Sequence, residues 1–180
     1  MKKEIHISIM GEIGLPKLEL IKYYMDSKNI REEKHKDGRL YFLKNKTKIK
    51  IYEFSKILDK KEKRSKDIAN NNNQCIIIVF DMNDRNSFID VLDKWIKYLR
   101  ELKYKNKIIL FGSYTEENKD ELPMTDEREI KDLFEVTQIN GEFIDIRNKT
   151  KEDIINIIET CIEKIFSEFS NNKNKKGLIF

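Results

Sequence analysis

Ile76-Ile77-Ile78-Val79-Phe80 is followed without a break by Asp81-Met82-Asn83-Asp84-Arg85-Asn86-Ser87-Phe88, and an amphipathic segment runs on from there past Trp95. Five apolar residues in a row are typical of a strand that is covered on both faces. From residue 87 to residue 102 the apolar side chains recur at helical spacing, which predicts a helix with one apolar face. That face consists of Phe88, Val91, Leu92, Trp95, Ile96 and Leu99. The stretch therefore predicts a buried strand, a turn that begins at Asp81, and a helix.

The rest of the chain also alternates between short apolar runs and helical patterns. Further strands are expected at residues 5–10, 39–43, 47–53, 107–111 and 143–146. Further helices are expected at residues 17–25, from Thr125 onward, and after Thr150, where Thr150-Lys151-Glu152-Asp153 resembles a capping box. Residues 26–38 are interpreted as a charged loop, and residues 57–74 as a mobile loop with room for one helical turn. This order predicts an α/β fold: a mostly parallel sheet of six strands, with helices on both faces. The hairpin formed by residues 39–53 is expected to supply one antiparallel edge strand.

Composition limits the classes of protein to which the chain can belong. Its 180 residues suit one domain with a sizeable core, and no apolar run is long enough to span a membrane. The net charge is +4, but 36 basic and 32 acidic residues are interspersed, which favours a solvated charged surface over a nucleic-acid site. Cys75 and Cys161 lie far apart in apolar contexts, so free buried thiols are expected.

The order strand, Asp81, turn, Ser87-Phe88, helix and Trp95 resembles the middle of a small GTPase of the Ras superfamily, with a Rab-like pattern. The resemblance extends from about Glu4 to Phe169. It implies a P-loop NTPase fold of the small-GTPase type, with a domain at residues 1–169 and a disordered basic tail at residues 170–180. A response-regulator or flavodoxin fold is disfavoured, because the first strand has neither an acidic cluster at its end nor an FMN loop.

The resemblance places a phosphate-binding loop after the first strand, at Gly11-Glu12-Ile13-Gly14-Leu15-Pro16-Lys17-Leu18. In a working loop of the form GxxxxGK[ST], backbone N–H groups wrap the phosphates, the lysine reaches the outer phosphates, and the hydroxyl binds magnesium. Gly11, Gly14 and Lys17 stand at the expected places. Pro16 removes one N–H donor, and Leu18 cannot ligate a hard cation. A degenerate phosphate site without a metal is therefore expected.

The two switch motifs are altered as well. Glu53 stands where the family has the acid that contacts magnesium through water. Lys56 replaces the glycine that reads the terminal phosphate, and Ile57 replaces the glutamine that orients water. Residues 26–38 contain no threonine for magnesium, and His35 is interpreted as a loop residue without a catalytic role. Hydrolysis of GTP is therefore expected to be lost or very weak, and no catalytic residue is predicted.

The resemblance also implies a degenerate guanine site. At the Asn-Lys-x-Asp motif the chain has Ser113, Tyr114 and, at the acid position, Glu116, whose side chain keeps the carboxylate but is longer than that of aspartate. At the last motif it has Asn148 and Lys149, of which only the lysine matches the family. Fold-bearing residues thus match along nearly the whole chain, whereas each motif carries a substitution that defeats its mechanism.

Two functions remain open on the sequence. The first is a pseudo-GTPase of the Rab or Ras type, with roles in signalling or vesicle trafficking, that binds a protein partner through its switch-side surface and needs no cofactor. The second is a divergent small GTPase that binds GDP or GTP weakly or without Mg²⁺. Cytoplasmic residence is expected, with recruitment to membranes only through a partner. The C-terminal residues Gly177-Leu178-Ile179-Phe180 include no cysteine for prenylation.

Overall fold

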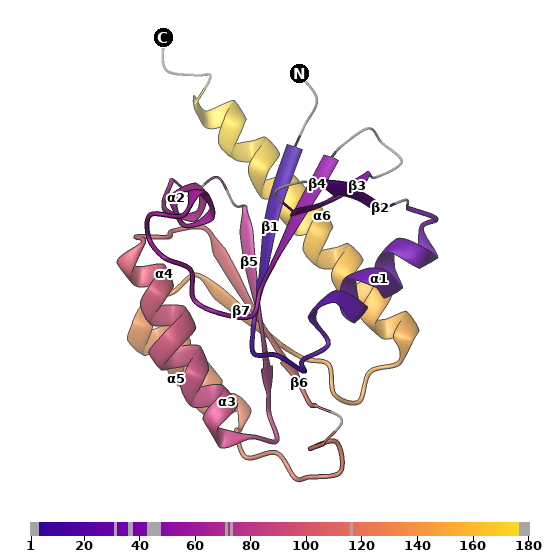
Figure 1. Cartoon of the computed structure of the whole chain (residues 1–180), viewed down its shortest axis with the longest axis vertical. Coiled ribbons are helices and arrows are strands. Elements are labelled where there is room, and N and C mark those ends of the chain that lie inside the picture. Colours follow the sequence, from indigo (N-terminus) through magenta and orange to yellow (C-terminus); the bar gives the residue numbers. More distant parts are fainter. Residues whose placement is uncertain are drawn as a thin grey trace.

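The computed structural model describes residues 4–30, 32–35, 38–42, 48–70, 72, 74–115 and 117–176. One seven-stranded sheet runs through the molecule in the order β2-β3-β4-β1-β5-β6-β7, and helices cover both of its faces (Figure 1). The strands are β1 (Glu4–Met10), β2 (Glu32–His35), β3 (Gly38–Phe42), β4 (Lys48–Phe54), β5 (Cys75–Asp81), β6 (Lys107–Ser113) and β7 (Gly141–Asp145). The α/β class and the helices on both faces are confirmed.

The sheet has five parallel strands and one antiparallel pairing region. Strands β4, β1, β5, β6 and β7 pair with one another in parallel. Strand β3 is antiparallel both to β4 and to β2. The expected six strands with one antiparallel edge strand are therefore wrong in detail, because β2 lies outside β3 and forms the edge. Residues 32–35 were interpreted as loop because their sequence shows no apolar period, whereas their backbone pairs antiparallel with β3.

Two helices pack on one face of the sheet and the remaining ones on the other (Figure 1). The first face holds α1 (Lys17–Ser27) and α6 (Lys151–Lys176). The second holds α2 (Lys63–Ala69), α3 (Arg85–Asp90), the π-helix η1 (Val91–Ile96), α4 (Lys97–Glu101) and α5 (Glu127–Thr137). All seven residues of β5 are buried between these layers, as its unbroken apolar sequence predicts.

The long helix predicted after Asp81 is interrupted by a π-turn. Segments α3, η1 and α4 follow one another without a break. A π-turn closes i→i+5 hydrogen bonds and so shifts the phase of the helix. Trp95 and Ile96 of η1 are buried, and so are Tyr98 and Leu99 of α4. Tyr98 was not among the predicted stripe residues, although it lies seven residues after Val91 and three after Trp95, at the edge of the same helix face.

Two segments are more ordered than the sequence indicates. Residues 57–74 were interpreted as a mobile loop, but they contain α2, whose Ile68 is fully buried. Helix α6 continues to Lys176, so residues 170–176 are helical rather than a disordered tail. An existing helix adds one hydrogen bond per residue without a new nucleus, which explains how a polar sequence can extend it. The last four residues lie outside the described residues.

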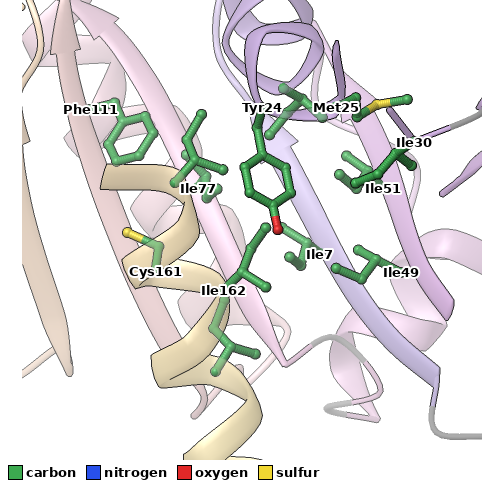
Figure 2. Close-up of a pocket in the computed structure, with 13 residues that line it drawn as sticks. Ile7, Tyr24, Met25, Ile30, Ile49, Ile51, Ile77, Phe111, Cys161 and Ile162 are labelled. Atoms are coloured by element: carbon green, nitrogen blue, oxygen red, sulfur yellow. The ribbon is translucent and has the colours of Figure 1, made fainter. Parts of the chain in front are cut away.

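Helix α6 and helix α1 enclose a small apolar cavity against the sheet (Figure 2). Tyr24 and Met25 reach it from α1, and Cys161 and Ile162 reach it from α6. The other walls are aliphatic side chains of β1, β4 and β5 and the ring of Phe111. Its volume of about 20 Å³ is enough for roughly one water, but apolar walls offer water no hydrogen bond. Cys75 and Cys161 are both buried and in no disulfide, as predicted.

Candidate functional site

The candidate site lies at one edge of the sheet, where the parallel strands end. Loops follow β1, β6 and β7 at this edge, and ligands of open α/β sheets bind in the crevice outside the carboxyl ends of the strands. The loop after β1 contains Gly11 and Gly14, and both have positive φ angles, +152° and +93°. A Cβ on Gly11 would lie 2.4 Å from the backbone oxygen of Val79 on β5. The loop therefore retains the compact shape that the two glycines allow.

Lys17, the phosphate-binding lysine of the predicted loop, points into the protein. Its side chain is only 2% exposed, and its Nζ donates a hydrogen bond to the backbone oxygen of Glu12. The Nζ also lies 3.9 Å from a carboxylate oxygen of Glu53. Burial lowers the pKa of Lys17, while the carboxylates of Glu53, Glu12 and Glu19 oppose this shift. The structure thus brings Lys17 and Glu53 together, but as partners of each other.

The same loop is also attached to the π-helix. Lys94 of η1 donates to a carboxylate oxygen of Glu12 at 3.3 Å and to Asp90 at 2.5 Å. The hydrogen bond to Asp90 is the largest cause that raises the pKa of Lys94. Ile13, between Glu12 and Gly14, is 84% exposed. The phosphate loop is therefore fixed at Glu12 from two sides, and its tip presents an isoleucine to solvent.

The residues present do not fit a magnesium ion. An aliphatic Leu18 stands at the position of the metal-binding hydroxyl, and Ile57 stands at that of the glutamine. The carboxylate of Glu53 is committed to the neighbourhood of Lys17. Within the part of the chain that the structure describes, no three His, Cys, Asp or Glu side chains are grouped as metal ligands would be.

A buried carboxylate, Asp81, organises the loop after β6. Its Oδ1 accepts from the backbone N–H of Asn83 at 2.8 Å. Its Oδ2 accepts from the backbone N–H and the hydroxyl of Thr115, at 2.9 and 3.0 Å, and from the side-chain amide of Asn118 at 3.1 Å. Asn83 also donates from its side chain to the backbone oxygen of Asn118 at 2.7 Å. Sequence reasoning identified Asp81 only as a landmark and missed Thr115 and Asn118, which lie more than 30 positions away.

The predicted guanine-binding residues are only partly assembled. Ser113 is buried at the end of β6, and its hydroxyl lies 3.4 Å from the backbone oxygen of Tyr114. Tyr114 is half-buried, and Asn148 and Lys149 are exposed in the loop after β7. Glu116, the most important acid of the predicted motif, lies outside the described residues. The structure therefore places four of the five residues at the same edge of the sheet but describes no shared hydrogen-bond network among them.

Arg147, which stands at the first position of the last motif but was not selected as a site residue, holds the loop after β7. It makes a two-armed ion pair with Asp145, with an Nη2–Oδ2 distance of 2.7 Å and an Nε–Oδ1 distance of 3.1 Å. Its Nη1 donates to the side-chain oxygen of Asn83 at 3.2 Å. Burial opposes the shift, but the hydrogen bonds from Arg147 hold the pKa of Asp145 below its usual range. An arginine two residues after an acid is a weak sequence signal, which explains the omission.

The comparison with protein families agrees with this arrangement of loops and strands. The model of the Ras family matches residues 9–167. The chain belongs to the Ras family. No curated protein matches it. Ras-family members typically bind GTP or GDP with Mg²⁺. No helix within the described residues has the length and apolar character needed to cross a bilayer.

Proposed function

We propose that this Ras-family chain is a pseudo-GTPase, a regulatory protein-binding module in which GTP hydrolysis is lost or very weak. The burial of Lys17 against the Glu12 carbonyl and the Glu53 carboxylate carries the proposal, because the cation that should meet phosphate is already satisfied inside the protein. The aliphatic side chains at positions 18 and 57 support it. Residues 26–38 contain no threonine for magnesium, and an isoleucine at position 57 cannot orient water.

The anchoring of α2 supports the binding role, because this segment lies where the family has its second switch. Ser65 Oγ lies 2.8 Å from the hydroxyl of Tyr98 and donates to the backbone oxygen of Asp59 at 2.6 Å. Lys60 pairs with Glu101 at 2.8 Å. The segment is thus fastened to α4, and we propose that it offers partners a fixed surface rather than one that changes with nucleotide.

We also propose a branch of the family, the bounds of the domain and a location in the cell. The stretch from Asp81 to Trp95 supports a Rab-like branch, with a role in signalling or vesicle trafficking. Residues 1–169 would form the domain. We place the protein in the cytoplasm, with membrane contact only through a partner.

A second candidate is a divergent guanine-nucleotide binder. It is favoured by the two glycines of the loop, which keep positive φ angles, and by the position of Lys17 at the N-terminus of α1, where backbone N–H groups attract phosphate. In this case Lys17 would have to leave the Glu12 carbonyl when nucleotide enters. Stoichiometric binding without Mg²⁺ would distinguish this candidate from the first.

The deciding experiment measures nucleotide directly. The purified protein is denatured, the released nucleotide is quantified by chromatography, and a fluorescent GDP analogue is titrated with and without Mg²⁺. The first proposal expects no released nucleotide, no saturable titration and no GTP turnover. A variant with Pro16→Gly and Leu18→Ser is the matched positive control, because it returns the donor and the hydroxyl that the loop lacks. Stoichiometric guanine nucleotide in the wild type, or turnover at rates usual for the family, would overturn the proposal.

A further inference from the structure

The loop between β6 and α5 exposes an apolar tip. Leu122 is 82% exposed and Met124 is 62% exposed, with Pro123 between them. Large apolar side chains gathered on one exposed loop mark an interaction site more often than single ones scattered over a surface. The proline restricts the backbone of the tip.

Both ends of this loop are held in place. On the first side, Asn118 is bound to Asp81 and Asn83, and Glu121 donates its N–H to the backbone oxygen of Asn118 at 3.0 Å. On the second side, Met124 donates its N–H to the backbone oxygen of Met82 at 2.8 Å. A tip that is fixed before binding loses little conformational entropy when it docks.

The loop is also acidic in a basic chain. Residues 117–127 carry five acidic side chains and one basic side chain, whereas the whole chain has a net charge of +4. Glu117, Asp120 and Glu121 are exposed on the approach to the tip. A surface that receives this tip should therefore combine an apolar floor with a basic rim.

Such a surface exists elsewhere on the same chain. A groove of about 590 Å³ lies between η1, α4 and the last residue of α5. Leu92 and Ile96 form its apolar part, and Lys97 and Arg100 line it with positive charge. It also contains Asp93 and Glu101, and Lys60 pairs with Glu101 at 2.8 Å, so that three basic and two acidic side chains give this surface a small net positive charge.

The tip cannot reach the groove of its own molecule. The loop precedes the first residue of α5, and the groove includes Thr137, the last residue of this 11-residue helix. The two ends of α5 are separated by roughly 16 Å along the helix axis. Figure 1 shows this loop at the lower edge of the molecule and α4 further up, beyond α3.

We propose that the Leu122-Pro123-Met124 tip of one molecule docks into the η1–α4–α5 groove of a second copy of this chain. The two surfaces differ, so the contact is heterologous and joins molecules head to tail. A contact of this limited area is weak, and self-association depends on concentration. Because acidic and basic side chains flank the contact, it weakens as salt rises. The inference does not depend on whether nucleotide binds.

Sedimentation velocity on the full chain tests the proposal, over protein concentrations from micromolar to near millimolar at low and high salt. The weight-average sedimentation coefficient of the wild type is expected to rise with concentration, and less so at high salt. The variant with Leu122→Ser and Met124→Ser is expected to remain monomeric. Ile13→Ser, at an equally exposed apolar residue outside the tip, is the matched control and should associate like the wild type. A wild type that stays monomeric at every concentration overturns the proposal, as does a tip variant that associates normally.

A charge exchange tests the pairing of the two surfaces. Arg100→Glu in the groove and Glu121→Lys beside the tip should each reduce association, and the chain that carries both changes should regain it. Both side chains are exposed, so thermal melting is expected to be unchanged and serves as the folding control. If Arg100→Glu lowers the melting temperature, Lys97→Glu replaces it. A double variant that associates no better than the single variants rules out the contact.

Discussion

Replacement of Asp81 by alanine is expected to destabilise the protein more than any other single exchange of a polar residue at the candidate site. The carboxylate is 2% exposed and accepts four hydrogen bonds, two from backbone N–H groups and two from side chains. Its loss leaves the N–H of Asn83, a buried residue, without its acceptor. The donors of Thr115 and Asn118 are half-buried and can turn partly to water.

The magnitude follows from these contacts. Hydrogen bonds to a charged group contribute about 1.5–3 kcal/mol each, and an unsatisfied buried donor costs about 1–3 kcal/mol. Because the four bonds share one carboxylate, their energies are not additive, and we expect a total loss of about 3–5 kcal/mol. This is a large part of the stability of a domain, which is about 5–15 kcal/mol.

Urea unfolding at equilibrium measures this loss, with Asp84→Ala as the matched control. Asp84 caps α3 through a single hydrogen bond from the N–H of Asn86 at 2.9 Å, so its replacement should cost only about 1 kcal/mol. Hydrogen exchange should also show that the N–H of Thr115 loses protection in the Asp81 variant alone. The reasoning is refuted if the Asp81 variant loses no more stability than the Asp84 variant.

Three further predictions concern the helix layers and the phosphate loop. Ser65→Ala removes the buried partner of the Tyr98 hydroxyl, so we expect the free energy of unfolding in urea to fall by about 1–2 kcal/mol. Hydrogen exchange across α2 should become faster, and unchanged exchange there would contradict the anchoring. Burial raises the pKa of Cys161 to about 11, so the stability it contributes is fully present below pH 9 and is lost as pH rises toward 11. Between pH 8 and pH 10.5 the free energy of unfolding of the wild type should therefore fall by on the order of 2 kcal/mol more than that of Cys161→Ala, and its melting temperature should fall further. Gly11→Ala should lower the urea midpoint far more than Gly14→Ala. An added Cβ at Gly11 would lie 2.4 Å from a backbone oxygen, whereas the nearest atom to one at Gly14 is a side-chain carbon at 3.9 Å, so equal effects would contradict this reasoning.

The sequence predicts the layers of the fold well because its periodicity is local. The apolar run 76–80 indicates a buried strand, and the capping box at Thr150 begins α6 as expected, with Asp153 accepting from the Thr150 hydroxyl at 2.8 Å. The predicted start of α5 is off by one residue, since Asp126 rather than Thr125 caps the helix. Strand β2 is missed because Glu32–His35 have no apolar alternation, and their pairing with β3 is a backbone contact that residue types do not indicate.

The candidate site was predicted less completely, because its contacts join distant parts of the chain. The positions of Gly11, Gly14 and Lys17 followed from the resemblance to the small GTPases, but the direction of the Lys17 side chain did not. Its hydrogen-bond acceptor is the backbone carbonyl of Glu12, which residue type does not single out within the loop, and its ion-pair partner Glu53 lies on β4, 36 positions further along the chain.

The alternation of strands and helices, the resemblance to the small GTPases and the substitutions at the nucleotide motifs can all be read from the sequence. Each of these is a property of residue types at fixed spacing. Only the tertiary structure decided that Lys17 is satisfied internally, that α2 is fastened to α4 and that Asp81 holds a loop 34 positions away. The physical reason is that a hydrogen bond depends on the position of both partners, and the packing of the sheet and helices brings those partners together.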